Sequence, residues 1–421
     1  MKLHRSLLSA ALALFAVLAL GQTPPVTTPP TTPPPGERVL TKEQREEVLK
    51  SLANIMENRA FVPGVDLKKW PEFIDKQKDD LEKAEKEVDL SRIVNRALRD
   101  FGISHIRFLT PRQADNRNRT SVVSIGVMAR TENNALVVTT VLPKSPAETA
   151  GIKQGDIITQ VDGKAPENSA VLNGEDGSEV KLKVKSGEAE KELTLKRARV
   201  STARPETLTW IDEETAVLKI WTFSRGYSRD NIETLMKEAN GKAKNLIVDL
   251  RSNGGGSTAS LIHLLSLFVK PDTDIGTFIS RNTVTDYEKD HTPSIDPVVI
   301  AAAAKNKYKT RKQSIEPFKG KVAVLINRGS ASASEIFAMG LRETISAPIL
   351  GTKSAGAVLA SVFGTLPQGF QIQYPVSDYV SIKGVRLEKN PIVPDEEVTG
   401  ASQDGKDPVV VKAVEKLKAA K

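Results

Sequence analysis

Two uninterrupted apolar runs constrain the fold of this chain most strongly. They are Leu-Ile-Val at residues 246–248 and Val-Ala-Val-Leu-Ile at residues 322–326. Runs of this kind are typical of parallel strands that are buried on both faces. After Pro205, stretches with strand and helix patterns alternate along the chain, which indicates crossover helices packed on a sheet. The sequence therefore predicts an α/β core in residues 201–421.

The predicted elements of this core follow from apolar periodicity. Strands are expected at 216–221, 245–250 and 322–326, and helices at 229–238, 257–269 and 332–342.

Two further regions precede the core. Residues 118–200 contain short β-branched runs at 135–141, 157–161 and 180–184, separated by Gly, Asp and Pro, which predicts a small β-rich domain. Residues 38–117 begin with a capping-box pattern, Thr41 and Gln44, and remain rich in helix-forming residues as far as Phe101. The predicted fold class is a multidomain α+β protein with a helical N-terminal region, a small β domain and an α/β core.

The first 37 residues have the composition of a targeting segment and a tether. Lys2 and Arg5 precede an apolar stretch at 7–20, which predicts a cleaved signal peptide at residues 1–21. Residues 22–37 are mostly Pro and Thr and are expected to be an extended linker. We therefore expect export to the periplasm or the extracellular space, without stable insertion in a membrane.

Composition argues against several function classes. The net charge is +8, but acidic residues are interleaved with the basic ones and only 5% of residues are aromatic, so we expect no nucleic-acid partner. The chain has no cysteine, which excludes disulfides and thiolate sites. No His-Glu-x-x-His motif or carboxylate cluster with ligand spacing is present, so neither a metal nor another cofactor is expected. The sequence makes no prediction of the oligomeric state.

The most informative segment is Asn-Arg-Gly-Ser-Ala-Ser-Ala-Ser-Glu at residues 327–335, between a buried strand and an amphipathic helix. A turn of small residues in this position exposes a hydroxyl and directs free N–H groups of the helix N-terminus toward the atom that it attacks. An equally weighted interpretation is a helix cap, because Ser332 is followed three residues later by Glu335. A second strand-to-turn segment, 248–257, contains the glycines 254–256 and lacks the Lys-Ser/Thr pair of a nucleotide-binding loop.

Together, these two segments resemble the core of carboxyl-terminal processing peptidases and of the related tricorn-type proteases. The resemblance implies that Ser332 is the nucleophile and that the N–H groups of Gly255 and Ala333 form the oxyanion hole.

In the β domain, Ser124, Ile125, Gly126 and Val127 resemble the carboxylate-binding loop of a PDZ domain, and the segments 145–152 and 155–158 resemble its remaining core. Such a domain binds a peptide as an added edge strand. The expected partners are therefore polypeptides with free C-termini.

The base that activates Ser332 is left open between two arrangements. In most of the family a lysine follows a glycine downstream of the nucleophile, but here the residue after Gly356 is Ala357, and the nearest lysine, Lys353, comes earlier.

The tricorn-type branch instead uses a Ser-His pair and a downstream glutamate. The matching residues here are Ser104, His105 and Glu388, so the resemblance favours His105 as the base, with Ser104 and Glu388 orienting the site and binding substrate. His263 is expected in the core and His291 in a polar loop, while Glu343 is interpreted either as a supporting acid or as a surface charge.

Three functions remain open on the sequence alone: a serine peptidase that uses His105, a Ser-Lys peptidase that uses Lys353, and a catalytically inactive protein whose PDZ domain captures C-terminal tails.

Overall fold

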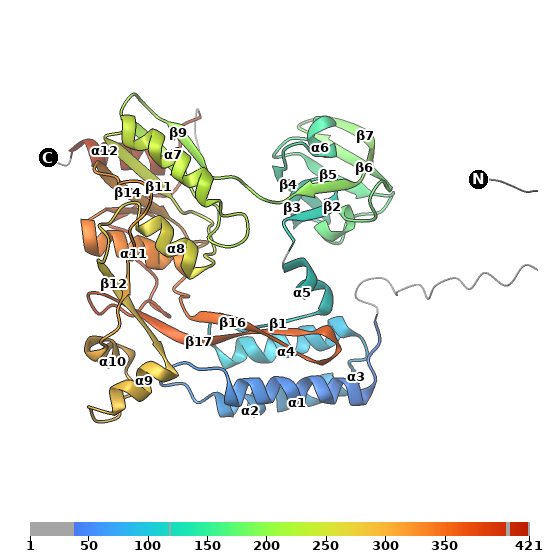
Figure 1. Cartoon of the computed structure of the whole chain (residues 1–421). Helices are drawn as coiled ribbons and strands as arrows, with labels where there is room; N and C mark the ends of the chain where they lie inside the picture. Colours follow the sequence, from blue (N-terminus) through green and yellow to red (C-terminus); the bar gives the residue numbers. More distant parts are fainter. Residues whose placement is uncertain (1–37, 118, 401–404, 420–421) are drawn as a thin grey trace, which may run out of the picture.

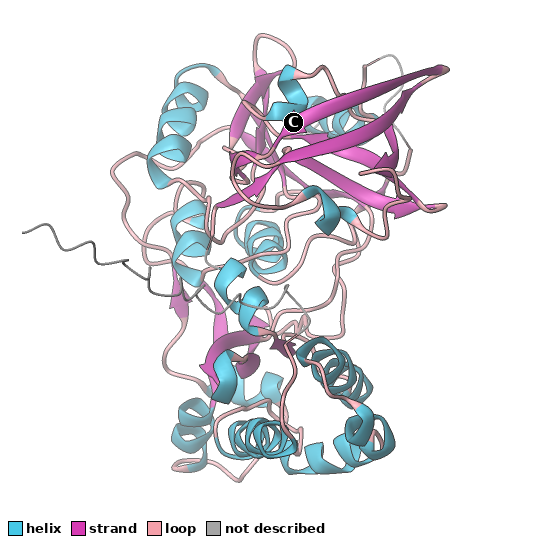
Figure 2. Cartoon of the chain, turned by 90° about the vertical axis from the view of Figure 1, so that its right-hand side faces the viewer, coloured by secondary structure: helices cyan, strands magenta, loops and turns pink. Residues whose placement is uncertain are grey.

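The computed structural model describes residues 38–117, 119–400 and 405–419. The predicted signal peptide and linker lie outside the described residues. Figure 1 shows a helical layer below, an α/β unit above it and a β-rich lobe to one side, and Figure 2 shows the helical layer at one end of the molecule.

The N-terminal region is helical, as predicted. Its elements are α1 (Lys42–Asn58), η1 (Leu67–Lys69), α2 (Trp70–Asp75), α3 (Lys78–Lys83), α4 (Glu87–Phe101), β1 (Arg107–Leu109) and α5 (Pro111–Arg117). The capping box at the start of α1 is confirmed, because Gln44 N donates to Thr41 Oγ1 at 3.3 Å and Thr41 N donates to Gln44 Oε1 at 2.9 Å. The apolar face of α1 and α4 packs against Phe370 and Ile372, which come from the far end of the chain. The helical region is therefore not a separate core, and the sequence did not predict this contact.

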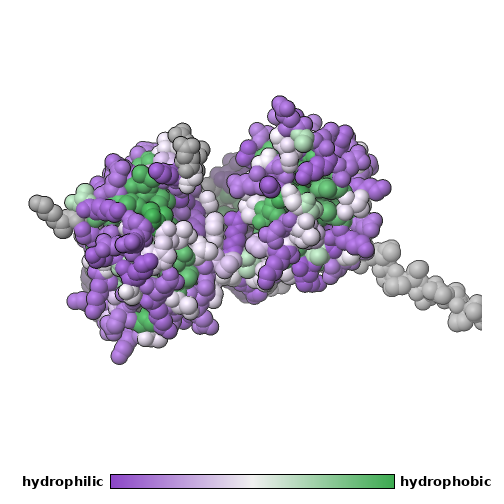
Figure 3. Space-filling view, turned by 90° about the horizontal axis from the view of Figure 1, so that it is seen from above, coloured by the Kyte–Doolittle hydropathy of each residue, from purple (hydrophilic) through white to green (hydrophobic). Residues whose placement is uncertain are grey.

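The β domain forms a distinct lobe (Figures 1 and 3). Its elements are β2 (Ser121–Ser124), β3 (Val127–Glu132), β4 (Ala135–Val141), α6 (Pro146–Thr149), β5 (Ile157–Val161), η2 (Ser169–Leu172), β6 (Glu179–Ser186), β7 (Ala189–Lys196) and β8 (Ala198–Ser201). One antiparallel sheet has the order β3-β4-β5-β6-β7, and β2 pairs with β8. The strands predicted at 135–141 and 157–161 have the observed bounds.

The α/β core is built on a mostly parallel sheet with the strand order β18-β15-β14-β11-β10-β9, in which β9 is antiparallel. Its elements are β9 (Thr207–Trp210), β10 (Thr215–Lys219), α7 (Arg229–Lys242), β11 (Asn245–Asp249), α8 (Thr258–Leu265), β14 (Lys321–Ile326), α11 (Ala333–Ile345), β15 (Ile349–Gly351), β18 (Glu396–Glu397) and α12 (Pro408–Ala419). The predicted helix at 257–269 ends earlier, at Leu265.

Both faces of the central strands are buried, as the apolar runs predict. Leu246 and Val248 pack with α7, α8 and α11 on one face, while Ile247 and Leu325 pack with α12 on the other. The carboxyl ends of β11 and β14 are neighbours in this sheet, since Asp249 pairs with Leu325. The turns that follow these two strands therefore meet at one edge, which is where the candidate site lies.

A second, antiparallel sheet joins the core to the helical layer. Its order is β1-β17-β12-β13, and β16 also pairs with β17. These elements are β12 (Asp274–Ser280), β13 (Tyr308–Lys309), β16 (Ala360–Thr365), η3 (Pro367–Gly369) and β17 (Gln371–Ser381), with α9 (Arg281–Glu288) and α10 (Pro297–Ala303) between β12 and β13. β1 follows α4 in the chain and pairs with β17. The second sheet therefore connects the end of the helical layer to the core (Figure 1).

Candidate active site

Ser332 has an unusual backbone conformation at the end of the turn between β14 and α11. Its φ is 58° and its ψ is −119°, which is sparsely populated for a residue other than glycine. Two contacts hold it there: Ser332 N donates to the carbonyl oxygen of Ala357 at 2.8 Å and to Glu335 Oε2 at 3.0 Å. Such strain costs about 1–3 kcal/mol and is concentrated at functional sites.

The glycine turn after β11 packs directly against this serine. Gly255 has a φ of 89°, and a Cβ at this position would lie 2.8 Å from Ser332 Cβ and 2.7 Å from the carbonyl oxygen of Ala331. A side chain therefore cannot be added here without displacing the nucleophile turn. Glycine at position 255 is explained by this close approach.

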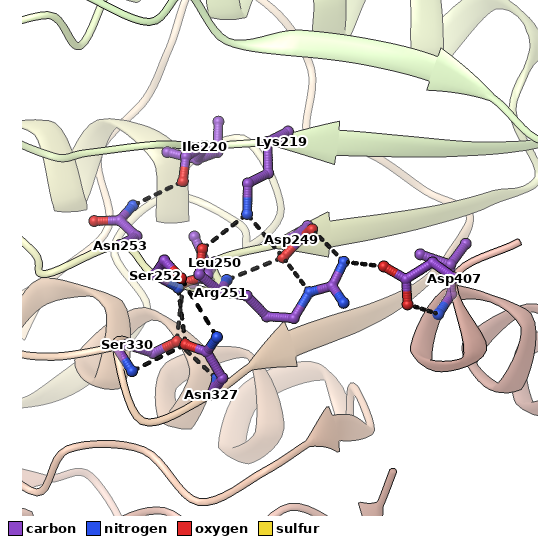
Figure 4. Close-up of polar contacts among 12 residues, drawn as sticks. Lys219, Ile220, Asp249, Leu250, Arg251, Ser252, Asn253, Asn327, Ser330 and Asp407 are labelled. Atoms are coloured by element: carbon purple, nitrogen blue, oxygen red, sulfur yellow. Dashed lines mark hydrogen bonds and ion pairs between the residues drawn. The ribbon is translucent and has the colours of Figure 1, made fainter. Parts of the chain in front are cut away.

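Hydrogen bonds lock the two turns to each other (Figure 4). Ser330 Oγ donates to the carbonyl oxygen of Leu250 at 2.9 Å, and Ser252 N donates to Asn327 Oδ1 at 2.8 Å. The relative position of the glycine turn and the nucleophile turn is thus fixed by several bonds rather than by one.

A charged cluster lies beside the glycine turn, at the end of β11 (Figure 4). The buried carboxylate of Asp249 lies 3.1 Å from Lys219 Nζ and 2.7 Å from Arg251, and Arg251 also lies 2.7 Å from Asp407. Burial alone would raise the pKa of Asp249, but the contacts with Arg251 and Lys219 together lower it below its ordinary value. The cluster ties the turn to the start of α12.

A cavity of about 520 Å³ lies in front of Ser332. His105, Gly255 and Ala333 line it together with Ser332, so the structure brings these predicted residues to one place. Further lining residues are both apolar and polar. The apolar ones include Leu261, Phe278, Ile336, Val358, Leu359 and Phe363, and the polar ones are Ser224, Ser257, Thr258, Ser361 and Gln373.

His105 is positioned by the end of α4. Gly102 has a φ of 77° and ends the helix in the left-handed conformation, and Ser104 and His105 follow at once. The Oγ of Ser104 lies 2.8 Å from His105 Nδ1 and 2.9 Å from Glu388 Oε2.

The hydrogen-bond chain determines which tautomer of His105 is present. An ionised carboxylate can only accept, so the hydroxyl of Ser104 donates to Glu388. The Oγ of Ser104 must then accept from the other side, and the Nδ1–H of His105 donates to it. The Nε2 of His105 consequently keeps its lone pair, as a general base requires.

Glu388 is buried in the loop after β17, and its Oε2 also accepts from Val358 N at 3.0 Å. Burial lowers the pKa of His105, and the negative charge of Glu388 opposes part of that effect. His105 is therefore neutral at pH 7.

The two predicted oxyanion donors differ in their surroundings. Ala333 is the first residue of α11, and N–H groups in the first turn of a helix have no acceptor within the helix. The N–H of Gly255 donates to Asn253 Oδ1 at 2.9 Å. Donation from Gly255 to a substrate therefore requires this bond to open or to be shared.

Sequence reasoning treated Glu335 only as a helix cap, and the structure gives it a larger part. Its side chain is buried and accepts from Ser354 Oγ at 2.6 Å, Gly356 N at 2.8 Å and Ala357 N at 3.0 Å, besides Ser332 N. Burial raises the pKa of Glu335, although these hydrogen bonds oppose the effect. Glu335 thus joins the nucleophile turn to the loop at 354–357. The only signal in the sequence was the acid three residues after Ser332.

Other sequence candidates lie away from the cavity. The side chain of Lys353 is exposed, and the residue does not contribute to the cavity lining. His263 is buried, with Nδ1 2.7 Å from the hydroxyl of Tyr227, and His291 is exposed. Glu343 is half-buried and accepts from Ser381 Oγ at 2.8 Å.

The candidate peptide-binding loop lies between β2 and β3. Gly126 has a φ of 83°, and its N–H donates to Ser124 Oγ at 2.9 Å. A Cβ on Gly126 would lie 2.2 Å from Ser145 Cβ, so the loop is tightly packed. Val127 begins β3, which pairs only with β4 among the described strands and presents a free edge next to the loop.

Within the described ranges, no cluster of three or more His, Cys, Asp or Glu side chains is arranged to hold a metal ion. No helix in the same ranges is long and apolar enough to cross a membrane.

A strained serine between a strand and a helix, facing a cavity that it shares with an oriented histidine, is an arrangement that serine hydrolases use. Comparison with known families makes this specific: residues 214–398 match the model of peptidase family S41, and residues 123–196 match that of the PDZ domain. The chain thus contains a region similar to peptidase family S41, preceded by a region similar to PDZ domains.

Individual relatives agree with this placement. Probable CtpA-like serine proteases of Staphylococcus haemolyticus and Staphylococcus epidermidis are 28% and 29% identical to this chain over 283 and 278 residues. The matches cover 66% and 63% of this chain and 52% of each relative, so the chain spans about half the length of these curated relatives.

Solved structures share the fold. The photosystem II D1 C-terminal processing protease matches with a TM-score of 0.51 at 21% identity, over 90% of this chain and 98% of that one. The tricorn protease matches with a TM-score of 0.50 at 16% identity, over 89% of this chain and 36% of that one.

Proposed function

We propose that this chain is an exported serine endopeptidase that cleaves unfolded polypeptides or polypeptides with exposed C-termini, with Ser332 as nucleophile and His105 as base. The observation that carries this proposal is the cavity shared by Ser332 and His105, together with the Ser104 and Glu388 contacts that leave Nε2 of His105 free to accept a proton.

In the proposed reaction, Ser332 Oγ attacks the peptide carbonyl carbon and its proton moves to His105 Nε2. The N–H of Ala333, and that of Gly255 once its bond to Asn253 opens, stabilise the negative charge on the carbonyl oxygen. His105 then gives its proton to the leaving amine, and the acyl group stays on Ser332 until water, deprotonated by His105, releases it. The growing positive charge on the imidazole is stabilised through Ser104 by Glu388.

The PDZ domain is proposed to assist by capturing the free C-terminus of the polypeptide. The loop 124–127 and the adjoining free edge of β3 supply backbone groups for the carboxylate and for strand addition. Export is proposed from the predicted signal peptide at residues 1–21.

The two other candidate functions have less support. A displaced Ser-Lys dyad requires Lys353 to enter the cavity, whereas its side chain is exposed outside the lining. A catalytically inactive tail-binding protein would have no use for the strained conformation of Ser332.

The test is degradation of an unfolded model protein by the mature chain and by its Ser332→Ala variant. We expect rapid degradation by the first and none by the second, with the same circular dichroism spectrum for both. Equal rates would refute Ser332 as the nucleophile, and no degradation by either would favour the inactive tail-binding protein.

A further inference from the structure

A second cavity, of about 430 Å³, adjoins the catalytic cavity. It is formed by α9, by the end of α10 and by the segment leading into β13. Four aromatic side chains line it: Phe278, Tyr287, His291 and Tyr308.

The two cavities share a wall. Phe278 lines both of them, and its ring lies edge-on to that of Tyr308, with the ring centroids 5.1 Å apart. Tyr308 in turn donates its hydroxyl to the carbonyl oxygen of Thr258 at 2.6 Å, and Thr258 lines the catalytic cavity. The two cavities are therefore neighbours on either side of Phe278, and the Tyr308–Thr258 hydrogen bond joins their linings.

Part of the wall of the second cavity is aromatic, and contacts between side chains hold these rings in place. The other lining residues are charged, polar or small: Thr283, Asp286, Lys289, Asp290, Ala303, Ala304, Lys305, Asn306 and Lys307. Tyr287 and His291 stack with their ring centroids 4.6 Å apart, and His291 Nδ1 lies 3.1 Å from the carbonyl oxygen of Tyr287. Prealigned rings favour another ring, because edge and face contacts between aromatic groups add to the burial of apolar area.

The charges at the rim do not favour a basic ligand. Asp286 pairs with Lys289 at 2.7 Å and Asp290 pairs with Lys305 at 3.3 Å, so both carboxylates already have a basic partner. Lys307 also lines the cavity and adds a positive charge. An apolar side chain is consequently preferred over a lysine or arginine side chain.

We propose that this second cavity is a substrate subsite that takes an aromatic side chain of the polypeptide bound across Ser332. The inference rests on the proposed function, and it adds a preference for an aromatic residue at one fixed distance from the cleaved bond.

Binding to the Ser332→Ala chain tests the subsite without turnover. A set of fluorescent peptides carries a single Phe at each successive position of an otherwise Ala- and Ser-based sequence. We expect one position at which Phe binds about tenfold or more tightly than Ala, the scale of discrimination by an apolar pocket.

Two variants change the second cavity in opposite ways. Tyr287→Ala removes one wall, and Ala303→Phe fills the space from the end of α10. Both should reduce the preference for Phe at that position to below about threefold, since a tenfold pocket preference depends on the fit of the ring. The matched control is Val299→Ala, on an exposed position of α10 outside the cavity lining, which should keep the preference.

The subsite is refuted if no position prefers Phe, or if neither cavity variant changes the preference. Turnover of the same peptides by the chain with Ser332 intact is measured separately. If the chain shows no turnover but its preference for Phe is reduced by both variants, the proposed peptidase activity is wrong and the subsite stands.

Discussion

Replacing Glu388 by glutamine tests the hydrogen-bond chain in detail, because it removes a buried charge and keeps the shape. Both Ser104 Oγ and Val358 N donate to the same oxygen of Glu388, at 2.9 and 3.0 Å. The amide oxygen of glutamine should take that place, since two donors point at it. Ser104 then still accepts from His105 Nδ1–H, and the tautomer of His105 is preserved.

What the Glu388→Gln variant loses is the negative charge that stabilises the imidazolium in the transition state. A hydrogen bond to a charged group contributes about 1.5–3 kcal/mol and a neutral one about 0.5–1.5 kcal/mol, so the loss is about 1–1.5 kcal/mol. Because 1.36 kcal/mol corresponds to one factor of ten in rate, kcat/KM should fall about tenfold. Glu388→Ala, which leaves both donors without an acceptor, should lose far more.

The pH profile of the Glu388→Gln variant gives an independent test, namely the direction in which the acid limb of kcat/KM shifts. Neutral His105 is the active form, and burial places its pKa below the ordinary 6.5, while Glu388 opposes that shift. Removing the charge lowers this pKa further, so the acid limb of kcat/KM should move to lower pH. The assay is hydrolysis of a quenched fluorescent peptide between about pH 4 and 8. A limb that moves upward, or a loss as large as that of Ser332→Ala, would refute the hydrogen-bond chain.

Three further predictions concern the rest of the site. The Lys353→Ala variant should keep most of the peptide turnover, because the side chain of Lys353 is exposed outside the cavity. If Lys353→Ala is inactive while His105→Ala is active, the site is a displaced Ser-Lys dyad. The Gly255→Ala variant should have no turnover, because the added Cβ would lie 2.8 Å from Ser332 Cβ. For the same reason its free energy of unfolding, measured by urea titration, should fall by about 1–3 kcal/mol. Native activity in this variant would refute the close approach. The loop 124–127 should bind a peptide with a free C-terminus more tightly than its amidated twin in a fluorescence titration, and equal affinities would exclude carboxylate capture.

Local patterns predicted the elements of the fold well. The runs at 246–248 and 322–326 are buried on both faces, and β4 and β5 have the expected bounds, because apolar periodicity reports burial directly. The second sheet was not predicted. Its strand β17 pairs with β1, more than 260 residues earlier in the sequence, as in the register Arg107 to Gln373, and no local signal specifies such a partner.

The site was predictable to the extent that it follows from motifs. The resemblance named Ser104, His105 and Glu388, and the structure places them in hydrogen-bond contact. The role of Glu335 was not predictable, because its interpretation as a cap is correct locally and its contacts with the loop at 354–357 depend on tertiary packing. The bond from Gly255 N–H to Asn253 Oδ1 was also missed, although it is local and an Asn side chain commonly accepts from the backbone N–H two residues on.

The central claim is that Ser332 and His105 act as one unit, and a double-mutant comparison tests it most directly. Hydrolysis of one peptide is measured at pH 7 for the unmodified chain, for Ser332→Ala, for His105→Ala and for the double variant, with circular dichroism to confirm that all four fold alike. Because a nucleophile and its base contribute to the same proton transfer, each single variant should lose nearly as much turnover as the double variant. Losses that multiply in the double variant, or a His105→Ala variant that retains substantial turnover, would contradict the assignment of His105 as the base.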